Sequence, residues 1–284
     1  MPPFFEHKHR IVYSKIELPY NLDEISHPSA RECLKFMEIE QGVEIHHAGD
    51  LPARSGIGSS SAFTVGLLHA LHALKGQKVD KYELALEAIH VEQDLIQENV
   101  GSQDQLSCCM GGFNYIKFGN HKPVVKQLEI TPDRIKMLES CLMLVFTGFP
   151  HLATEVAKTY DFKTREAEIK EIMSFTNDTY AILTRGHVCD YGKIMHETWN
   201  MKKKLSNKIS SPYIDYIYKR ALECGATGGR LIGAGSSGFM ALFCEPDKQI
   251  NLRNSDPFKG LLFVPFKFET GENVGSRIVS QNGD

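Results

Sequence analysis

The sequence predicts an α+β fold in two lobes, and three observations support that prediction. Strand-like and helix-like segments mix without the regular βαβ alternation of a doubly wound parallel sheet. After Gly148 the character changes, and the chain reads almost entirely as helix as far as Leu222. Strand-like runs then return from Gly229 onward. We therefore expect an N-terminal lobe over residues 1–150 and a C-terminal lobe over residues 151–284.

The elements of the first half follow from hydrophobic spacing. Residues 10–18 alternate apolar and polar side chains well enough to predict a strand. Residues 80–97 place Leu84, Ala88 and Leu95 on one face of a helix. The expected order is strand 10–18, helix 29–38, strand 42–47, helices 58–74 and 80–97, and a short helix ending at Met110.

The second half begins with strands and continues with helices. Residues 142–147 form a short, almost continuous apolar run, which is typical of a buried strand. Strands are expected over 113–118, 124–130, 142–147, 229–232, 239–244 and 261–268, with helical segments between residues 151 and 222 that are interrupted at Gly186, Gly192 and Ser211-Pro212. The polar tail 271–284 is expected to fray.

Composition and charge exclude several classes of partner. The chain has 284 residues, of which 42% are hydrophobic and 24% charged, as in soluble globular proteins. Its net charge of −3 gives no electrostatic reason to expect nucleic acid or an anionic membrane as partner. No apolar run is long enough to span a bilayer, and the N-terminus lacks the pattern of a secretory signal. We expect a cytoplasmic protein, and the sequence leaves its oligomeric state open.

The cysteines indicate a reducing compartment, and the histidines do not indicate a metal site. The seven cysteines include no C-x-x-C pair, and most lie in apolar stretches, which indicates buried thiols in a reducing compartment. The twelve histidines do not show the H-E-x-x-H spacing of a zinc site. We expect no structural metal.

A Gly/Ser-rich segment runs from Pro52 to Phe63, with two glycines and three serines directly before an apolar helical pattern. Glycine permits close approach of the backbone, and the first N–H groups of a helix attract anions, so phosphate is the natural ligand. The segment lacks the G-K-[ST] of a P-loop and the third glycine of a Rossmann turn. The alternative is a turn whose serine caps the helix.

A second glycine-rich segment extends from Gly228 to Phe239, between two strand-like runs. Taken alone, it is better interpreted as a hairpin loop. The presence of two such segments in one chain favours a nucleotide site.

Two carboxylates lie on either side of a helix break. Glu92 comes late in one helix, and Asp104 begins the next helix beyond the break at Gly101. Such carboxylates can converge, one holding Mg²⁺ and the other accepting a hydroxyl proton. The alternative, a pair of surface carboxylates, is favoured for Asp94 and Glu98. The apolar residues after Asp104 argue against exposure of its side chain.

These motifs together resemble the GHMP kinases, a family that includes galactokinase, homoserine kinase, mevalonate kinase and phosphomevalonate kinase. The segment Pro52-x-x-x-Gly56-Ile57-Gly58-Ser59-Ser60-Ser61-Ala62 resembles their second motif, and Gly228–Phe239 resembles their third. Gly101-x-x-Asp104-Gln105 resembles the region of their catalytic aspartate. The bacterial D-glycero-D-manno-heptose 7-phosphate kinases are similar in further stretches, at residues 92–105, 111–114, 199–206, 209–215 and 264–268. The resemblance covers most of the chain from about Arg10.

The resemblance implies a fold and an activity. The fold is a ribosomal-protein-S5-domain-2-like N-terminal lobe, which holds ATP, and a ferredoxin-like C-terminal lobe. The activity is ATP- and Mg²⁺-dependent phosphorylation of a small sugar phosphate, D-glycero-D-manno-heptose 7-phosphate at its anomeric hydroxyl. The alternatives are another sugar-1-kinase, such as a galactokinase-like or fucokinase-like enzyme, and a truncated, inactive nucleotide-binding remnant.

The resemblance also implies roles for single residues. Asp104 would act on the anomeric hydroxyl as base or electrostatic partner, and Ser60 and Glu92 would bind Mg²⁺, with Ser59 also near the ion. Lys203 would contact the sugar phosphate, although the run Lys202–Lys204 is equally typical of a solvated helix face. The residues implied for ATP binding are Pro52, Gly56, Gly58, Ser59, Ser60 and Ser61, supported by Gly233, Gly235 and Gly238.

The sequence departs from the family pattern in three places. No segment corresponds to the first motif, a strand and Gly-rich turn that contacts the sugar, so we expect an incomplete N-terminal lobe. Ser236 and Ser237 stand where the family has glycines, and His151 stands where an arginine is expected. Each change removes backbone freedom or a charge that would face phosphate.

Overall fold

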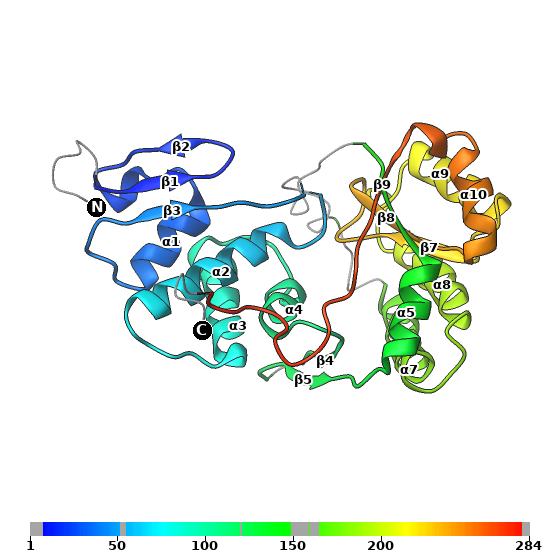
Figure 1. Ribbon diagram of the computed structural model, residues 1–284, viewed down its shortest axis with the longest axis horizontal. Helices are drawn as coiled ribbons and strands as arrows, with labels where there is room; N and C mark the ends of the chain where they lie inside the picture. The colour runs from blue at the N-terminus through cyan, green and yellow to red at the C-terminus, as the bar shows by residue number, and fades with distance from the viewer. Residues whose placement is uncertain (1–7, 52–54, 120, 149–158, 160–164, 280–284) are drawn as a thin grey trace. The chain divides into compact units, whose positions relative to one another are not determined.

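The computed structural model describes residues 8–51, 55–119, 121–148, 159 and 165–279. These residues form two compact units (Figure 1). The first unit comprises Met1–Ala53, Gly58–Gly112 and Thr270–Asp284, and the second comprises Arg54–Ile57 and Phe113–Glu269. Because the units interleave along the sequence, the lobes expected at residues 1–150 and 151–284 stay a prediction. No helix within the described ranges is both long and apolar enough to cross a bilayer.

The first unit contains a small sheet in the order β2-β1-β3, formed by β1 (Arg10–Val12), β2 (Ile16–Glu17) and β3 (Glu44–His46). β1 pairs antiparallel with β2 and parallel with β3. The single strand expected over residues 10–18 is therefore wrong. A tight turn closed by the Tyr13 N–H and the Lys15 carbonyl (2.8 Å) converts the segment into a hairpin.

The helices of the first unit pack around an apolar core that includes Leu34, Leu68, Leu84 and Leu106. They are η1 (Leu22–Glu24), α1 (Pro28–Phe36), α2 (Ser59–Leu74), α3 (Lys81–His90), η2 (Val91–Leu95) and α4 (Gln103–Met110). The helix expected over residues 80–97 ends as the π-helical turn η2, which carries Glu92. Such turns are frequent at functional sites because the extra residue re-aims a side chain.

The C-terminal segment of the first unit packs against the helices around Val274 and Ser276, and the expectation that the tail frays stays a prediction. Val274 is buried, and its carbonyl accepts a hydrogen bond from the Lys81 Nζ. The Ser276 N–H donates to the Cys109 carbonyl at 3.2 Å. A methyl group on Gly111 would overlap the backbone of Gly275, so this close approach requires glycine.

The second unit is built on an antiparallel sheet in the order β7-β8-β6-β9. Its strands are β6 (Leu142–Phe146), β7 (Gly228–Leu231), β8 (Phe239–Phe243) and β9 (Leu262–Val264), and β4 (Asn114–Lys117) with β5 (Val124–Gln127) forms a separate antiparallel pair. The strand-like runs of the sequence analysis correspond to these strands.

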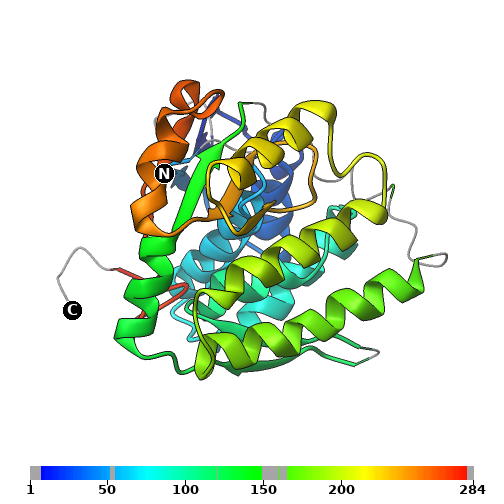
Figure 2. The same cartoon turned by 90° about the vertical axis from the view of Figure 1, so that its right-hand side faces the viewer.

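The helices of the second unit are α5 (Pro132–Cys141), α7 (Glu166–Thr184), α8 (Asp190–Lys204), α9 (Pro212–Glu223) and α10 (Pro246–Asn254), with a short turn η3 (Phe258–Gly260). The long helices α7 and α8 run side by side (Figure 2). Sequence analysis missed α5 and α10. Both begin with a proline at the first helical position, which was an available signal.

The helix α8 packs closely on β7, and this contact fixes the site described below. A side chain on Gly192 would overlap Thr227, and one on Gly228 would overlap the Gly192 carbonyl. The expected helix interruption at Gly192 is therefore wrong. This glycine lies inside α8 because the strand leaves no room for a larger residue.

Candidate functional site

The first element of the candidate site is the N-terminus of α2. Gly58 caps the helix in the left-handed conformation (φ 75°), and its carbonyl accepts the Ala62 N–H at 2.9 Å. The helix has 16 residues, and its first-turn N–H groups have no acceptor within the helix. Ser60 is exposed at this end, while Ser59 is half-buried. The helix N-terminus that the sequence predicts is thus present at Ser59 and Ser60, and phosphate binding by these residues stays a prediction.

The structure brings Glu92 to the same end of α2. The Ser61 hydroxyl donates to Glu92 Oε2 at 2.9 Å, and the Gln105 amide donates to the same oxygen. Glu92 is only 1% exposed, and its Oε1 is buried without a hydrogen bond from any described residue. Ser61 is itself buried, so its hydroxyl orients Glu92. Gln105 is a site residue that sequence analysis missed.

The orphaned Glu92 Oε1 fits a cation. Burial raises the pKa of Glu92, and the nearby hydroxyls of Thr64 and Ser61 and the Gln105 amide only partly oppose that effect. A carboxylate oxygen that lacks a donor can be satisfied by a hard cation such as Mg²⁺. No group of three His, Cys, Asp or Glu side chains gathers as a metal site in the part of the chain that the structure describes. A cation at Glu92 would therefore take its other oxygen ligands from a serine hydroxyl, a nucleotide or water, as Mg²⁺ commonly does.

Asp104 lies beside the glycine that caps α2. It occupies the first turn of α4, and a methyl group placed on Gly58 would lie 3.4 Å from Asp104 Oδ2. The residue is half-buried, and this burial raises the pKa of its carboxyl group. The start of α2 and both predicted carboxylates, Glu92 and Asp104, thus converge.

The other two carboxylates of this segment differ from each other. Asp94 is exposed and pairs with His90 at 2.7 Å, as a surface carboxylate would. Glu98 is partly buried, and this burial raises the pKa of its side chain, so it is less exposed than Asp94.

Within the second unit, the two glycine-rich segments meet backbone to backbone. A methyl group on Gly56 (φ 84°) would lie 2.9 Å from the Ile232 carbonyl oxygen, and one on Gly233 (φ 74°) would lie 2.5 Å from the Gly56 carbonyl oxygen. The Phe239 N–H donates to the Ser55 carbonyl at 3.3 Å. The hairpin interpretation of Gly228–Phe239 is correct, since β7 and β8 flank it, and the hairpin turn also contacts the first glycine segment.

Three further groups hold the hairpin turn. The Thr147 hydroxyl donates to the Gly238 carbonyl at 2.8 Å, and the Ser236 N–H donates to the Ile209 carbonyl at 2.7 Å. The Gly233 carbonyl accepts a hydrogen bond from the Lys202 Nζ. Ser236 takes a left-handed φ of 74° despite its side chain, a conformation that glycine adopts more easily.

Lys202 and Lys203 have different environments. Lys202 is 8% exposed and contacts the glycine turn, whereas Lys203 pairs with Asp215 at 3.3 Å and lies 5.9 Å from the centre of the Trp199 ring. Sequence analysis singled out Lys203 and missed Lys202. Met195, Trp199 and Lys202 lie on one buried face of α8, and their helical spacing was the available signal.

The burial of Lys202 predicts a pH-dependent stability. Burial, with a smaller effect of Arg230, lowers the pKa of Lys202 to about 7 from 10.5. Between these values the unfolded chain binds more protons than the folded chain, so the free energy of unfolding rises with pH. The limit for one proton is about 1.4 kcal/mol per pH unit.

We expect the melting temperature of the unchanged chain, relative to Lys202→Met, to rise steadily from pH 7 to pH 9.5 in thermal unfolding measurements. Other titrating groups are common to both proteins and cancel in the difference. A flat difference would contradict the burial of the amine.

The contact of Gly233 with Gly56 predicts a steric effect with a matched control. Gly233→Ala should destabilise the chain by about 1–3 kcal/mol, because the methyl group meets the Gly56 carbonyl and the residue has a positive φ. Gly66→Ala should stabilise it by about 0.5–1 kcal/mol, since Gly66 lies inside α2 with no atom near the added methyl group. Chemical denaturation measures both changes, and equal signs would contradict the described backbone contact.

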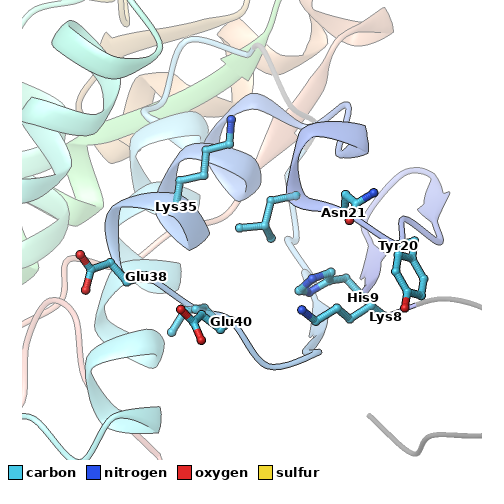
Figure 3. A pocket seen from close by; sticks show the side chains of 9 residues that line it. Lys8, His9, Tyr20, Asn21, Lys35, Glu38 and Glu40 are labelled. Atoms are coloured by element: carbon cyan, nitrogen blue, oxygen red, sulfur yellow. The ribbon is translucent and has the colours of Figure 1, made fainter.

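Two residues singled out by the sequence, Pro52 and His151, lie outside the described residues. A hollow of about 510 Å³ lies elsewhere in the first unit (Figure 3). None of the predicted site residues lines it. Its walls carry both charge signs, from Lys8 and Lys35 and from Glu38 and Glu40. We assign no ligand to this hollow.

Comparisons with known sequences identify two family matches. Residues 28–112 match the GHMP kinases N terminal domain, and residues 184–255 match the GHMP kinases C terminal domain. The D-glycero-alpha-D-manno-heptose 7-phosphate kinase of Campylobacter jejuni is 31% identical over 226 residues, which are 76% of this chain and 66% of that protein. The galactokinase of Pyrococcus furiosus is 25% identical over 73% of this chain and 66% of its own length. The chain thus spans slightly less than two thirds of these relatives.

Solved structures show the same fold. A D-glycero-D-manno-heptose 1-phosphate kinase from Bacteroides thetaiotaomicron superposes with a TM-score of 0.73 at 23% identity, covering 97% of this chain and 85% of that one. The mevalonate kinase of Methanococcus jannaschii superposes with a TM-score of 0.71 at 18% identity, covering 93% and 86%. These likenesses confirm the α+β fold that the sequence predicts.

Proposed function

Because this chain belongs to the GHMP kinase family, we propose that it is a kinase that transfers the γ-phosphoryl group of ATP to a hydroxyl group of a sugar or sugar phosphate. The observation that carries the proposal is the convergence of Glu92 and Asp104 at the N-terminus of α2. That helix end can bind phosphate, and the two carboxylates can serve the metal and the acceptor hydroxyl separately.

The proposed roles at α2 follow from burial and hydrogen bonding. The exposed Ser60 and the first-turn N–H groups bind phosphate oxygens. Glu92, oriented by Ser61 and Gln105, binds Mg²⁺ together with Ser60. When bound, Mg²⁺ supplies positive charge that neutralises the phosphates during transfer. We assign Gly56, Gly233, Gly235 and Gly238 to nucleotide binding, as the resemblance to the family implies.

Asp104 accepts the proton of the attacking hydroxyl in this proposal. The proton moves to the Asp104 carboxylate as the oxygen bonds to the γ-phosphorus and the bond to ADP breaks. The raised pKa of Asp104 suits this role, because a more basic carboxylate is a better proton acceptor. Among the described residues, no group donates a hydrogen bond to this carboxylate, so its oxygens are available to a substrate.

We propose D-glycero-D-manno-heptose 7-phosphate as the acceptor, phosphorylated at its anomeric hydroxyl. The support is the identity with the C. jejuni relative that bears this substrate in its name. Galactokinases and an L-fucokinase also match the chain, so another sugar-1-kinase activity is the alternative. The sugar-phosphate contact of Lys203 belongs to this proposal, although Lys203 pairs with Asp215.

A reducing compartment suits the thiols. All seven cysteines are free, and Cys33, Cys109, Cys141 and Cys244 are buried. Free thiols persist where glutathione and thioredoxin keep them reduced. We therefore propose a cytoplasmic location, with a small sugar phosphate as partner.

The test combines nucleotide binding with phosphoryl transfer. The purified chain is titrated with ATP and Mg²⁺ by calorimetry, and ADP release is then followed with heptose 7-phosphate, galactose, fucose and mevalonate. Phosphorus NMR identifies the phosphorylated position. We expect turnover with the heptose phosphate and a new anomeric phosphate signal. ATP binding without turnover on any acceptor would favour the nucleotide-binding remnant, and turnover on galactose or fucose alone would favour the other sugar kinases.

A further inference from the structure

Lys202 is a buried side chain for which the proposed reaction has no role so far. It lies in the last turn of α8, and its amine donates a hydrogen bond to the Gly233 carbonyl. In the part of the chain that the structure describes, no carboxylate pairs with it. Lysine is almost never buried without a partner, because its ammonium group loses hydration. Because burial of this amine lowers the stability of the fold, we expect Lys202 to have a functional role.

The amine is presented from a rigid frame. Trp199 is fully buried one turn before Lys202, and the close contact of Gly192 with Gly228 fixes α8 against β7. Since α8 cannot move away from the strand without opening this contact, the amine is held at a constant position. A long side chain on a fixed helix can hold a mobile turn in one conformation.

The bonded carbonyl belongs to the residue that contacts the first glycine segment. A side chain on Gly233 would overlap the Gly56 carbonyl, and one on Gly56 would press against the carbonyl of the neighbouring Ile232. The far side of the hairpin turn is anchored through Ser236 and Gly238. On the near side, Lys202 is the side chain whose hydrogen bond reaches Gly233.

We propose that Lys202 is a positioning residue for nucleotide binding, which holds the Gly233 carbonyl so that the turn keeps the Gly56 segment in its binding conformation. The proposal rests on the proposed function, because it takes the Gly56 segment to serve the phosphates of ATP. Lys193, an exposed lysine of the same helix α8 that pairs with Asp190 at 3.0 Å, provides a matched control.

The experiment compares Lys202→Met, Lys202→Arg and Lys193→Met in the full chain. Hydrogen–deuterium exchange by mass spectrometry follows the peptides that contain residues 55–57 and 228–239. Titration with the non-hydrolysable analogue AMP-PNP and Mg²⁺ gives the nucleotide affinity. Thermal unfolding shows whether each variant is folded at the assay temperature.

We expect Lys202→Met to exchange faster in both peptides and to bind AMP-PNP about three- to tenfold more weakly, the effect of losing one hydrogen bond. Lys202→Arg keeps a long donor and should restore most of the affinity and protection. Lys193→Met should match the unchanged chain in both measurements.

Several results would overturn the proposal. Unchanged exchange in Lys202→Met would show that Lys202 does not position the turn. An equal loss of protection and affinity in Lys193→Met would show the same. If Lys202→Met does not fold, Lys202→Arg is compared instead with Lys202→Gln, whose donor is too short to reach Gly233. An equal loss of AMP-PNP affinity and of exchange protection in these two variants would exclude the hydrogen bond to Gly233 as the cause. If the unchanged chain binds no nucleotide, the proposed function fails, while exchange still decides whether Lys202 positions the turn.

Discussion

Replacing Asp104 with asparagine is expected to slow phosphoryl transfer by about 10²- to 10⁴-fold, the usual contribution of a general base. ATP affinity should change less than about threefold, because the interaction is made with the acceptor hydroxyl and not with the nucleotide. The amide is nearly the same size and should keep the contact with Gly58. The half-buried carboxylate has a raised pKa, so its replacement by a neutral group should not destabilise the fold.

Steady-state kinetics and calorimetry on Asp104→Asn measure the two effects separately. Asp94→Asn is the matched control, since Asp94 is exposed and bonded to His90 in the same stretch of chain. It should retain the full rate. Undiminished turnover in Asp104→Asn would remove Asp104 from the reaction.

The second large effect is expected from Glu92→Gln. The side chain keeps its size and an oxygen to accept from Ser61 and Gln105, but it loses the charge that would hold Mg²⁺. We expect the Mg²⁺ concentration for half-maximal rate to rise at least about tenfold, the effect of losing about 1.4 kcal/mol of binding free energy. The maximal rate should fall by about 10²-fold, because the phosphates are then neutralised poorly.

Glu92→Gln should increase the stability of the fold although it lowers the activity. An unpaired oxygen of a buried carboxylate costs more than a buried amide, so the melting temperature in EDTA should rise by a few degrees, about 2–4 °C per kcal/mol for a chain near this size. Adding Mg²⁺ with AMP-PNP should then stabilise the unchanged chain more than the variant.

Glu98→Gln is the control for both measurements, because Glu98 is partly buried nearby but bonds neither Ser61 nor Gln105. It should leave the Mg²⁺ dependence unchanged. An unaltered Mg²⁺ dependence in Glu92→Gln would mean that this carboxylate does not bind the metal.

Local sequence patterns predicted the helices around Glu92 and Asp104. The apolar spacing after Ser61 predicted α2, and the break at Gly101 predicted that Glu92 and Asp104 lie on separate elements. The π-helical turn at Glu92 was not predictable, because a single extra residue in a turn leaves little trace in hydrophobic spacing. The helix across Gly192 was mispredicted for a related reason. Glycine normally weakens a helix, and only its contact with Gly228 explains its presence there.

By itself, the sequence determined the α+β class, the two glycine-rich turns and the family, because these depend on the order and spacing of residues. The tertiary structure alone decided which of these residues meet. Ser61 and Gln105 bond Glu92, and the two glycine turns contact each other far along the chain. It also decided that Lys202, and not its neighbour Lys203, reaches the glycine turn. The physical reason is that hydrogen-bond partners and burial are set by packing between distant segments, whereas periodicity reports only which face of each segment is buried.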